Sequence, residues 1–157
     1  MPTTTLPNLG VRLRWMLRQD MPAVLSIESA SFAEPWQAAD FSRCLRRRTC
    51  IGYVAEATAG GVVGYTLYDL ESDHLRVVNL AVSPAVRGRG VGAELVRKLV
   101  HKAVTHRRER IETTVGERND VAIAFFRACG FKATGVAWGR FTGGDGINMS
   151  LDVEAAR

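Results

Sequence analysis

Residues 77–96 read VVNLAVSPAVRGRGVGAELV, and this stretch decides the fold of the chain. Its apolar start predicts a strand that ends before Pro84, and its apolar end predicts a helix. The loop between them carries glycines at positions 88, 90 and 92, which alternate with Arg87, Arg89 and Val91. Glycine lets the backbone approach a ligand closely, and the first amides of a helix have no partner within that helix. The stretch therefore predicts an anion site of the kind that binds a diphosphate.

Other glycine-rich loops fit this stretch less well. A Walker loop ends in Gly-Lys-Ser/Thr, whereas Gly92 is followed by Ala93 and Glu94. A dinucleotide fingerprint has the spacing GxGxxG and follows the first strand, whereas this loop has GxGxG and follows the fourth predicted strand. A loop that only caps the helix remains as the structural alternative.

The rest of the chain predicts alternating strands and helices in the order βααβββαβαββ. This order is typical of a mixed α/β (α+β) domain, with a central six- to seven-stranded mixed, twisted sheet and helices on both faces. Asp20 is expected to cap the first helix, and Gly143–Gly146 to form the last hairpin turn. The predicted strands cover residues 11–17, 50–57, 62–70, 75–83, 110–115, 131–140 and 146–153. We expect residues 1–10 to form a flexible tail and residues 11–157 to form one domain.

Length and composition bound the class of protein. The chain has 157 residues, of which 46% are hydrophobic and 24% charged, as expected for one globular domain. No segment has the length and apolarity of a transmembrane helix, and the N-terminus lacks the pattern of a secretory signal. Three cysteines without a CxxC motif disfavour a disulfide framework and a zinc site. We therefore expect a reduced, cytoplasmic protein without a metal and without a membrane partner.

The chain is basic, with 21 Lys and Arg against 16 Asp and Glu. This balance fits an anionic cofactor, a ribonucleoprotein partner or simple solubility. The clusters Arg46–Arg48 and Arg107-Arg108 lie near predicted helix ends, where cations complement the helix dipole. Because no RNP-like aromatic motif or zinc-finger spacing accompanies them, we expect no direct readout of nucleic acid.

Three segments together carry a family resemblance. Residues 77–96 resemble motif A of the GNAT superfamily of N-acetyltransferases, an Arg/Gln-x-x-Gly-x-Gly/Ala loop after a bulged strand. Residues 119–131, NDVAIAFFRACGF, resemble motif B, a helix that begins at an asparagine and ends in Gly-Phe. Upstream, Glu28-x-x-Ser31-Phe32 with Pro35-Trp36 resembles the substrate-side helices of RimI-type ribosomal-protein alanine acetyltransferases. The resemblance covers about residues 11–153.

The resemblance implies acetyl-CoA as co-substrate and assigns roles to single residues. The pantetheine arm would pair with the strand end Leu80, Ala81 and Val82, as an added strand would. The Val82 amide would stabilise the oxyanion of the tetrahedral intermediate. Asn119 would lie near the reactive end of the cofactor, although a plain helix cap explains it equally well. The remaining implied contacts are the diphosphate loop Arg87, Gly88, Arg89, Gly90, Val91, Gly92 and Ala93, Phe126 beside the cofactor, and Phe32, Pro35 and Trp36 on the substrate side.

The sequence departs from the RimI pattern at both acid–base positions. The family glutamate that acts as general base corresponds to Thr114, and the family tyrosine that protonates the thiolate corresponds to Phe126. Neither side chain exchanges protons at neutral pH. Glu112 projects on the same strand face as Thr114 and is a candidate base acting through water, the alternative being an ordinary exposed carboxylate. Tyr65, Tyr68 and Glu117 are weaker substitutes.

These patterns predict an acetyl-CoA-dependent N-acetyltransferase. The predicted acceptor is the N-terminal α-amine of a protein, for which a ribosomal protein is one candidate, and the amine would attack the thioester directly. A small-molecule amine is the second candidate acceptor. A catalytically weak acyl-CoA-binding protein is the third reading, because both matched acid–base groups are missing.

Overall fold

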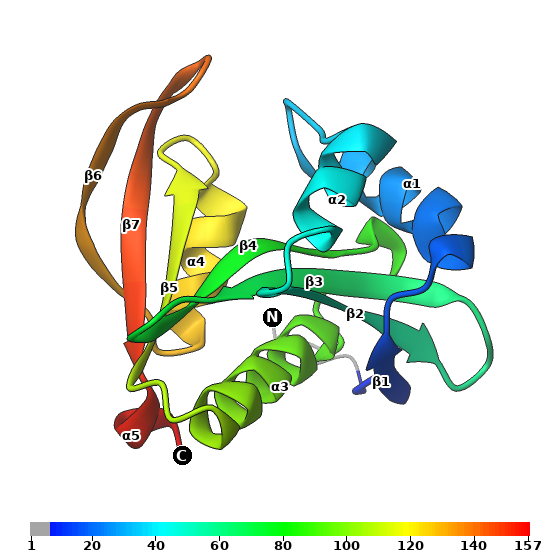
Figure 1. The fold of residues 1–157 in the computed structure, drawn as a ribbon. Helices are drawn as coiled ribbons and strands as arrows, with labels where there is room; N and C mark the ends of the chain where they lie inside the picture. Colours follow the sequence, from blue (N-terminus) through cyan, green and yellow to red (C-terminus); the bar gives the residue numbers. More distant parts are fainter. Residues whose placement is uncertain (1–6) are drawn as a thin grey trace, which may run out of the picture. The chain divides into compact units, whose positions relative to one another are not determined.

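The computed structural model describes residues 7–157. The strands are β1 (Val11–Trp15), β2 (Cys50–Ala57), β3 (Val62–Leu70), β4 (His74–Val82), β5 (Arg110–Gly116), β6 (Lys132–Phe141) and β7 (Gly144–Asp152). The α-helices are α1 (Met21–Ser31), α2 (Ala38–Leu45), α3 (Val91–Thr105), α4 (Asp120–Ala128) and α5 (Val153–Ala156). Two 3-10 turns, η1 (Arg18–Asp20) and η2 (Pro84–Val86), precede α1 and the glycine-rich loop. The predicted order of strands and longer helices is confirmed (Figure 1).

Hydrogen bonds join the strands into one seven-stranded mixed sheet in the order β1-β2-β3-β4-β5-β7-β6. Strand β4 pairs with β5 in parallel, from His74 opposite Arg110 to Val77 opposite Thr113. Helix α3 connects these two strands, since parallel neighbours need a crossover. The last strand, β7, lies between β5 and β6 and is antiparallel to both. The mixed α/β class expected from the sequence is confirmed.

The chain divides into two compact units. The first contains the described residues up to Leu67 together with Asn79–Leu95, and the second contains Tyr68–Val78 with Val96–Arg157. In the first unit, Val91 and Leu95 of α3 pack with Ala55 as a buried cluster. A Cβ on Gly64 of β3 would lie 3.2 Å from a Val91 methyl, so α3 covers this face of the strand. The next residue, Tyr65, points to the opposite face and contacts Glu28 of α1.

The second unit is built around the β5–β7–β6 ladder. Figure 1 shows β6 and β7 as a long curved hairpin. The pairing of β6 with β7 shifts register twice, between Ala133 and Gly135 and between Ala137 and Phe141. The phenyl rings of Phe125 and Phe126 of α4 pack edge to face, with centroids 5.1 Å apart, and Phe126 packs in the same way on Phe131.

Two local expectations are wrong. Asp20 makes no capping hydrogen bond to α1, because its carboxylate accepts the Leu17 amide at 2.7 Å and closes the 3-10 turn before the helix. The last hairpin turns at Thr142 and Gly143, so Gly144 and Gly146 belong to β7. The Asp145 carboxylate accepts the Gly139 amide across this hairpin at 2.6 Å, which holds the shorter turn in place.

Asp20 also forms a buried ion pair that ties β1 to the start of α1. The Arg14 guanidinium donates to both Asp20 carboxylate oxygens at 2.8 Å, and its Nε donates to Glu56 at 2.7 Å. Only 5% of Asp20 is exposed. The hydrogen bonds from Arg14 lower the pKa of Asp20 below its ordinary value.

We expect Asp20→Asn to lower the free energy of unfolding at pH 7 by about 2–3 kcal/mol, because it removes the anion from a buried charged hydrogen bond. A carboxyl whose folded pKa is lowered stabilises the fold above its unfolded pKa of about 3.9, and this stabilisation is lost as the pH falls. The difference between the two proteins should therefore shrink below about pH 4 in urea titrations. The exposed Asp120→Asn change is the control and should cost less than about 0.5 kcal/mol. An equal cost of Asp20→Asn at pH 7 and pH 3 would contradict the ion pair.

Candidate active site

The glycine-rich loop begins at the end of β4 and delivers the start of α3. Gly88 and Gly90 have φ values of +77° and +83°, a region in which side chains with a Cβ are strained. The Glu94 amide donates to the Gly90 carbonyl at 3.1 Å, which begins the hydrogen bonding of α3. The amides of residues 91–93 precede that bond and have no acceptor within the helix. This geometry fits the predicted anion site.

Contacts on three sides hold the loop. The Arg87 Nε donates to the Val82 carbonyl at 3.1 Å, and its Nη2 donates to the Ser31 hydroxyl at 3.0 Å. Arg87 thus ties the loop to β4 and to the end of α1. The Leu9 amide donates to the Arg89 carbonyl at 2.9 Å, and Arg89 Nε donates to the Pro7 carbonyl at 3.1 Å. Pro7 and Leu9, which belong to the predicted tail, are therefore hydrogen-bonded to the loop. Residues 1–6 of that tail lie outside the residues that the structure describes.

The end of β4 carries the predicted pantetheine strand. The Ser83 amide donates to the Val63 carbonyl of β3 at 2.8 Å. Because successive amides of a strand point to opposite edges, the Val82 amide points away from β3. This orientation is compatible with the predicted oxyanion role of Val82, and the pantetheine contacts of Leu80, Ala81 and Val82 stay predictions.

The buried carboxylate of Glu28 lies beside this strand. In the sequence, Glu28 stands out only as part of a motif. Glu28 of α1 is 2% exposed and accepts three hydrogen bonds. The donors are the Tyr65 hydroxyl, the Asn79 side-chain amide at 2.8 Å and the Trp36 backbone amide at 3.0 Å. Burial, and next the charge of Glu28, raise the pKa of Tyr65, so its hydroxyl stays protonated at neutral pH. Glu28 thereby fixes the Pro35-Trp36 turn against β3 and β4.

The predicted substrate-side residues lie at the end of α1 (Phe32) and in this turn (Pro35 and Trp36), and all three are half-buried. The Trp36 ring packs edge to face on Phe41, with centroids 5.2 Å apart, and Phe41 packs in the same way on Tyr65 at 5.8 Å. Phe32 ends α1, where its amide donates to the Glu28 carbonyl. The structure thus brings Phe32, Pro35 and Trp36 together around Glu28, within the same unit as the glycine-rich loop.

The other predicted site residues belong to the second unit. The Asn119 side chain accepts the Ala122 amide at 3.1 Å, which is the capping role. Phe126, at the family tyrosine position, is buried between Phe125 and Phe131. The cofactor contacts of both residues stay predictions.

Glu112, the candidate base, has partners at both oxygens. Its Oε1 accepts from Arg110 Nε at 2.7 Å, and its Oε2 lies 3.2 Å from His74 Nε2. Thr114, at the family base position, accepts from Arg76 Nη2 at 3.0 Å and donates to Asn148 Oδ1 at 2.8 Å. No local sequence pattern singles out Arg76 and Asn148, because only the strand pairing places them beside Thr114.

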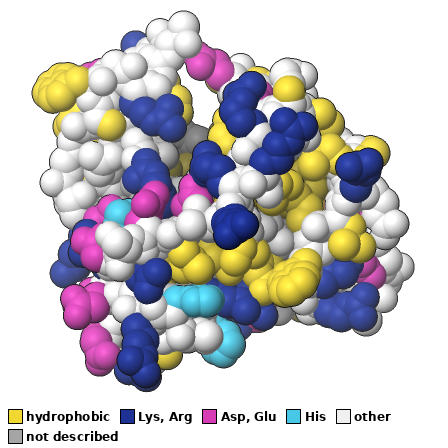
Figure 2. Space-filling view, in the orientation of Figure 1, with side chains coloured by type: hydrophobic (Ala, Val, Ile, Leu, Met, Phe, Trp, Pro, Cys, Tyr) yellow, Lys and Arg dark blue, Asp and Glu magenta, His cyan; other side chains and the backbone are white. Residues whose placement is uncertain are grey.

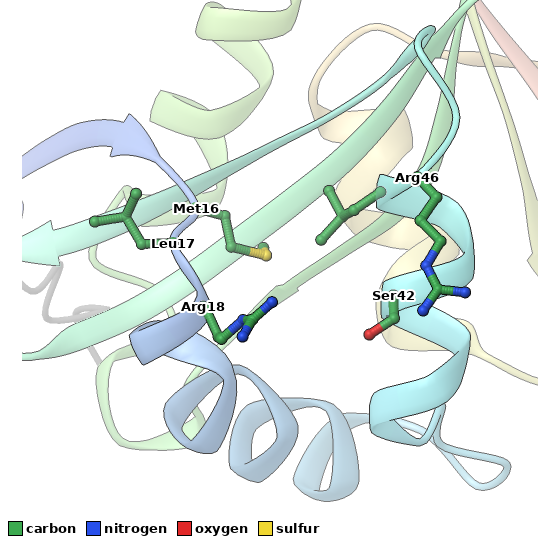
Figure 3. Close-up of a pocket in the computed structure, with 6 residues that line it drawn as sticks. Met16, Leu17, Arg18, Ser42 and Arg46 are labelled. Carbon is green, nitrogen blue, oxygen red and sulfur yellow. The ribbon is translucent and has the colours of Figure 1, made fainter.

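A shallow pocket in the first unit shares no residue with these groups. Met16, Leu17 and Arg18 line it on one side, and Ser42, Leu45 and Arg46 of α2 and its end line it on the other. Arg18 and Ser42 point toward the space between them (Figure 3). In the space-filling view, Lys and Arg side chains form several separate groups on the face shown (Figure 2).

Comparison with known proteins decides the family. The family model described as "Acetyltransferase (GNAT) family" matches residues 15–131, which is more than half of the chain. This chain belongs to the GNAT family of acetyltransferases. The N-acetyltransferase class and acetyl-CoA as co-substrate, both predicted from the sequence, are confirmed. Among residues 7–157, none of the helices combines the length and the hydrophobicity that a membrane span requires.

Curated relatives differ in the acceptors that their names state. The N-alpha-acetyltransferase RimI of Mycobacterium tuberculosis is 30% identical over 145 residues, covering 87% of this chain and 89% of that protein. A putative ribosomal protein bS18-alanine N-acetyltransferase of Bacillus subtilis is 26% identical over 143 residues, and the match covers 90% of this chain and 95% of that protein. The L-2,4-diaminobutyric acid acetyltransferase of Nocardia farcinica is 35% identical over 111 residues, and the match spans 61% of this chain and 57% of that protein.

Solved structures share the fold. The ribosomal-protein-S18-alanine N-acetyltransferase of Escherichia coli superposes with a TM-score of 0.79 at 20% identity, over 92% of this chain and 94% of that one. Ard1 of Thermoplasma volcanium superposes with a TM-score of 0.81 at 23% identity, over 90% of this chain and 97% of that one. These likenesses confirm the fold predicted from the sequence.

The loop is tested by a charge placed at Gly88, where a Cβ meets no protein atom within 4 Å. Asp and Asn both tolerate positive φ, so Gly88→Asn is the matched neutral control. We expect Gly88→Asp to bind acetyl-CoA about tenfold or more weaker than Gly88→Asn, because a carboxylate repels the diphosphate. Isothermal titration calorimetry measures both affinities, and equal affinities would remove the diphosphate from this loop. Gly90 is unsuitable for the test, since a Cβ there would lie 2.8 Å from Asn8 Oδ1.

Proposed function

We propose that this protein acetylates the N-terminal α-amine of a protein by direct attack of the amine on the thioester of acetyl-CoA. The observation that carries the proposal is the glycine-rich loop at the start of α3, with its free helix amides and two glycines at positive φ. The near full-length similarity to RimI-type proteins supports a protein acceptor.

The missing family base favours an α-amine over a lysine side chain. An α-amine has a pKa of about 7.7–8.0, so about a tenth of it is neutral at pH 7. A lysine amine, with a pKa of about 10.4, is neutral in only about one molecule in 10³. An acceptor that supplies its own neutral amine depends little on a carboxylate at position 114.

In the proposed reaction, the amine nitrogen attacks the thioester carbonyl and forms a tetrahedral intermediate. The Val82 amide donates to the oxyanion, as its orientation away from β3 allows. The carbon–sulfur bond then breaks, coenzyme A leaves as a thiolate, and the amine proton passes to solvent. A thiol pKa of about 8.5 makes the thiolate a tolerable leaving group without a protein acid.

A small-molecule amine is the second candidate acceptor. The similarity to the diaminobutyric acid acetyltransferase favours it, although this match covers a smaller share of both chains than the RimI matches do.

An acceptor panel tests the proposal. The protein is incubated with acetyl-CoA and peptides with free N-termini, N-terminally blocked peptides that contain lysine, and L-2,4-diaminobutyrate, and products are identified by mass spectrometry. We expect one added acetyl group on the α-amine of free peptides and none on the blocked peptides. Acetylation of diaminobutyrate alone would replace the proposal by the second candidate, and the absence of any product would refute both.

Glu112→Gln tests the candidate base. Since both carboxylate oxygens of Glu112 are engaged by Arg110 and His74, we propose that it contributes little to proton transfer. We expect kcat/KM at pH 7 to fall less than tenfold, whereas a general base contributes about 10²–10⁴-fold. Stopped assays with the acceptor found in the panel measure the change, with the exposed Glu109→Gln as the matched control. A loss of about 100-fold or more, specific to Glu112, would assign it as the base.

A further inference from the structure

One face of the β4–β5 ladder is packed, and the other is polar and half-open. Leu75 and Val77 of β4 and Ile111 and Thr113 of β5 are buried. The residues that alternate with them along the two strands point to the opposite face and are half-buried; these are His74, Arg76, Glu112 and Thr114. Solvent therefore reaches part of the face on which Arg76 lies.

Two arginines on this polar face differ in their partners. Arg110 is paired with Glu112 at 2.7 Å and with Asp73 at 3.0 Å. Arg76 lies directly across the ladder from Glu112, yet its guanidinium bonds to the Thr114 hydroxyl instead. Within residues 7–157, no carboxylate lies at ion-pair distance from Arg76. A half-buried guanidinium without an anion has lost part of its hydration and keeps N–H donors for a ligand.

The hydrogen bonds around Arg76 all run in one direction. Arg76 donates to Thr114, and Thr114 donates to the Asn148 carbonyl oxygen. This leaves the other N–H groups of Arg76 and the side-chain NH₂ of Asn148, which have no acceptor among the residues that the structure describes. The open positions of the cluster are therefore donors, and donors bind an anion.

We propose that Arg76, with Asn148, binds a carboxylate that the acceptor carries close to its reacting amine. The inference rests on the proposed function and deepens it to a class of acceptor. Arg76 contacts Thr114 within the second unit, and Thr114 stands at the position where the family pattern has its general base. A guanidinium does not accept a proton, so it cannot replace the family base at position 114, but its planar fork matches a carboxylate in two parallel hydrogen bonds.

Matched pairs of acceptors test the inference. One pair is two hexapeptides that begin Ala-Glu or Ala-Gln and are otherwise identical, and the other is L-2,4-diaminobutyrate and its carboxamide. Affinities are measured by calorimetry in the presence of coenzyme A, which carries no acetyl group, so no turnover is needed. We expect the carboxylate member of one pair to bind about 10- to 100-fold tighter than its amide. The pair that shows the preference identifies the source of the carboxylate as a peptide side chain or a free amino acid.

Variants show which side chain causes the preference for the carboxylate acceptor. Arg76→Met keeps the length of the side chain without its charge and should bring the carboxylate-to-amide ratio near one, with the affinity for acetyl-CoA unchanged. Thr114→Glu places a carboxylate against Arg76 and should abolish the preference as well, which provides a second test if Arg76→Met folds poorly. Arg157→Met removes the same charge from an arginine that pairs with Glu154 at the end of the chain, and it should leave the ratio unchanged.

The outcomes separate the two proposals. The role of Arg76 is overturned if the unmodified protein shows a carboxylate-to-amide affinity ratio near one for both pairs. It is also overturned if a higher ratio persists in both Arg76→Met and Thr114→Glu. Neither result affects the proposed acetyl transfer. The absence of acetyl-CoA binding or of any product in the acceptor panel refutes the proposed function, whatever the ratios are.

Discussion

The close approach of α3 to β3 at Gly64 is the constraint on which the cofactor loop depends. A Cβ at this position would lie 3.2 Å from the Ala81 carbonyl and 3.2 Å from the Val91 side chain. A larger residue would push the first turn of α3 away from the sheet, and with it the amides that are predicted to bind a diphosphate. Arg87 then holds the loop from the other side, through Val82 and Ser31. Packing and hydrogen bonds within the chain thus fix the N-terminus of α3.

A second buried interaction shapes the substrate-side turn. Three neutral donors, from β3, β4 and the Pro35-Trp36 turn, satisfy the buried carboxylate of Glu28. Buried charges are costly unless they are fully hydrogen-bonded, so the loss of any one donor would weaken the whole arrangement. The motif that resembles the substrate-side helices is therefore held together by its glutamate, while its aromatic rings fill the space around that group.

The proposed chemistry of this chain relies on position more than on proton transfer. Thr114 and Phe126 replace the groups that exchange protons in the related RimI pattern, and Glu112 is engaged by two neighbours. Holding an amine and a thioester in reacting geometry supplies a large share of the acceleration of such reactions. The face that carries Thr114 is instead rich in hydrogen-bond donors. Donors of this kind select an acceptor by its charge.

Local patterns in the sequence determined the order of strands and helices, the glycine-rich loop and the Asn119 cap, because period, glycine spacing and capping chemistry act between residues close in the chain. They misplaced the last turn and the role of Asp20, since Asp145 bonds to Gly139 and Arg14 competes for Asp20. Only the tertiary structure decided which polar groups meet. Arg76, Thr114 and Asn148 lie on three strands, up to 72 residues apart in sequence. Strand register brings them within hydrogen-bond distance, and register depends on the packing of the whole sheet.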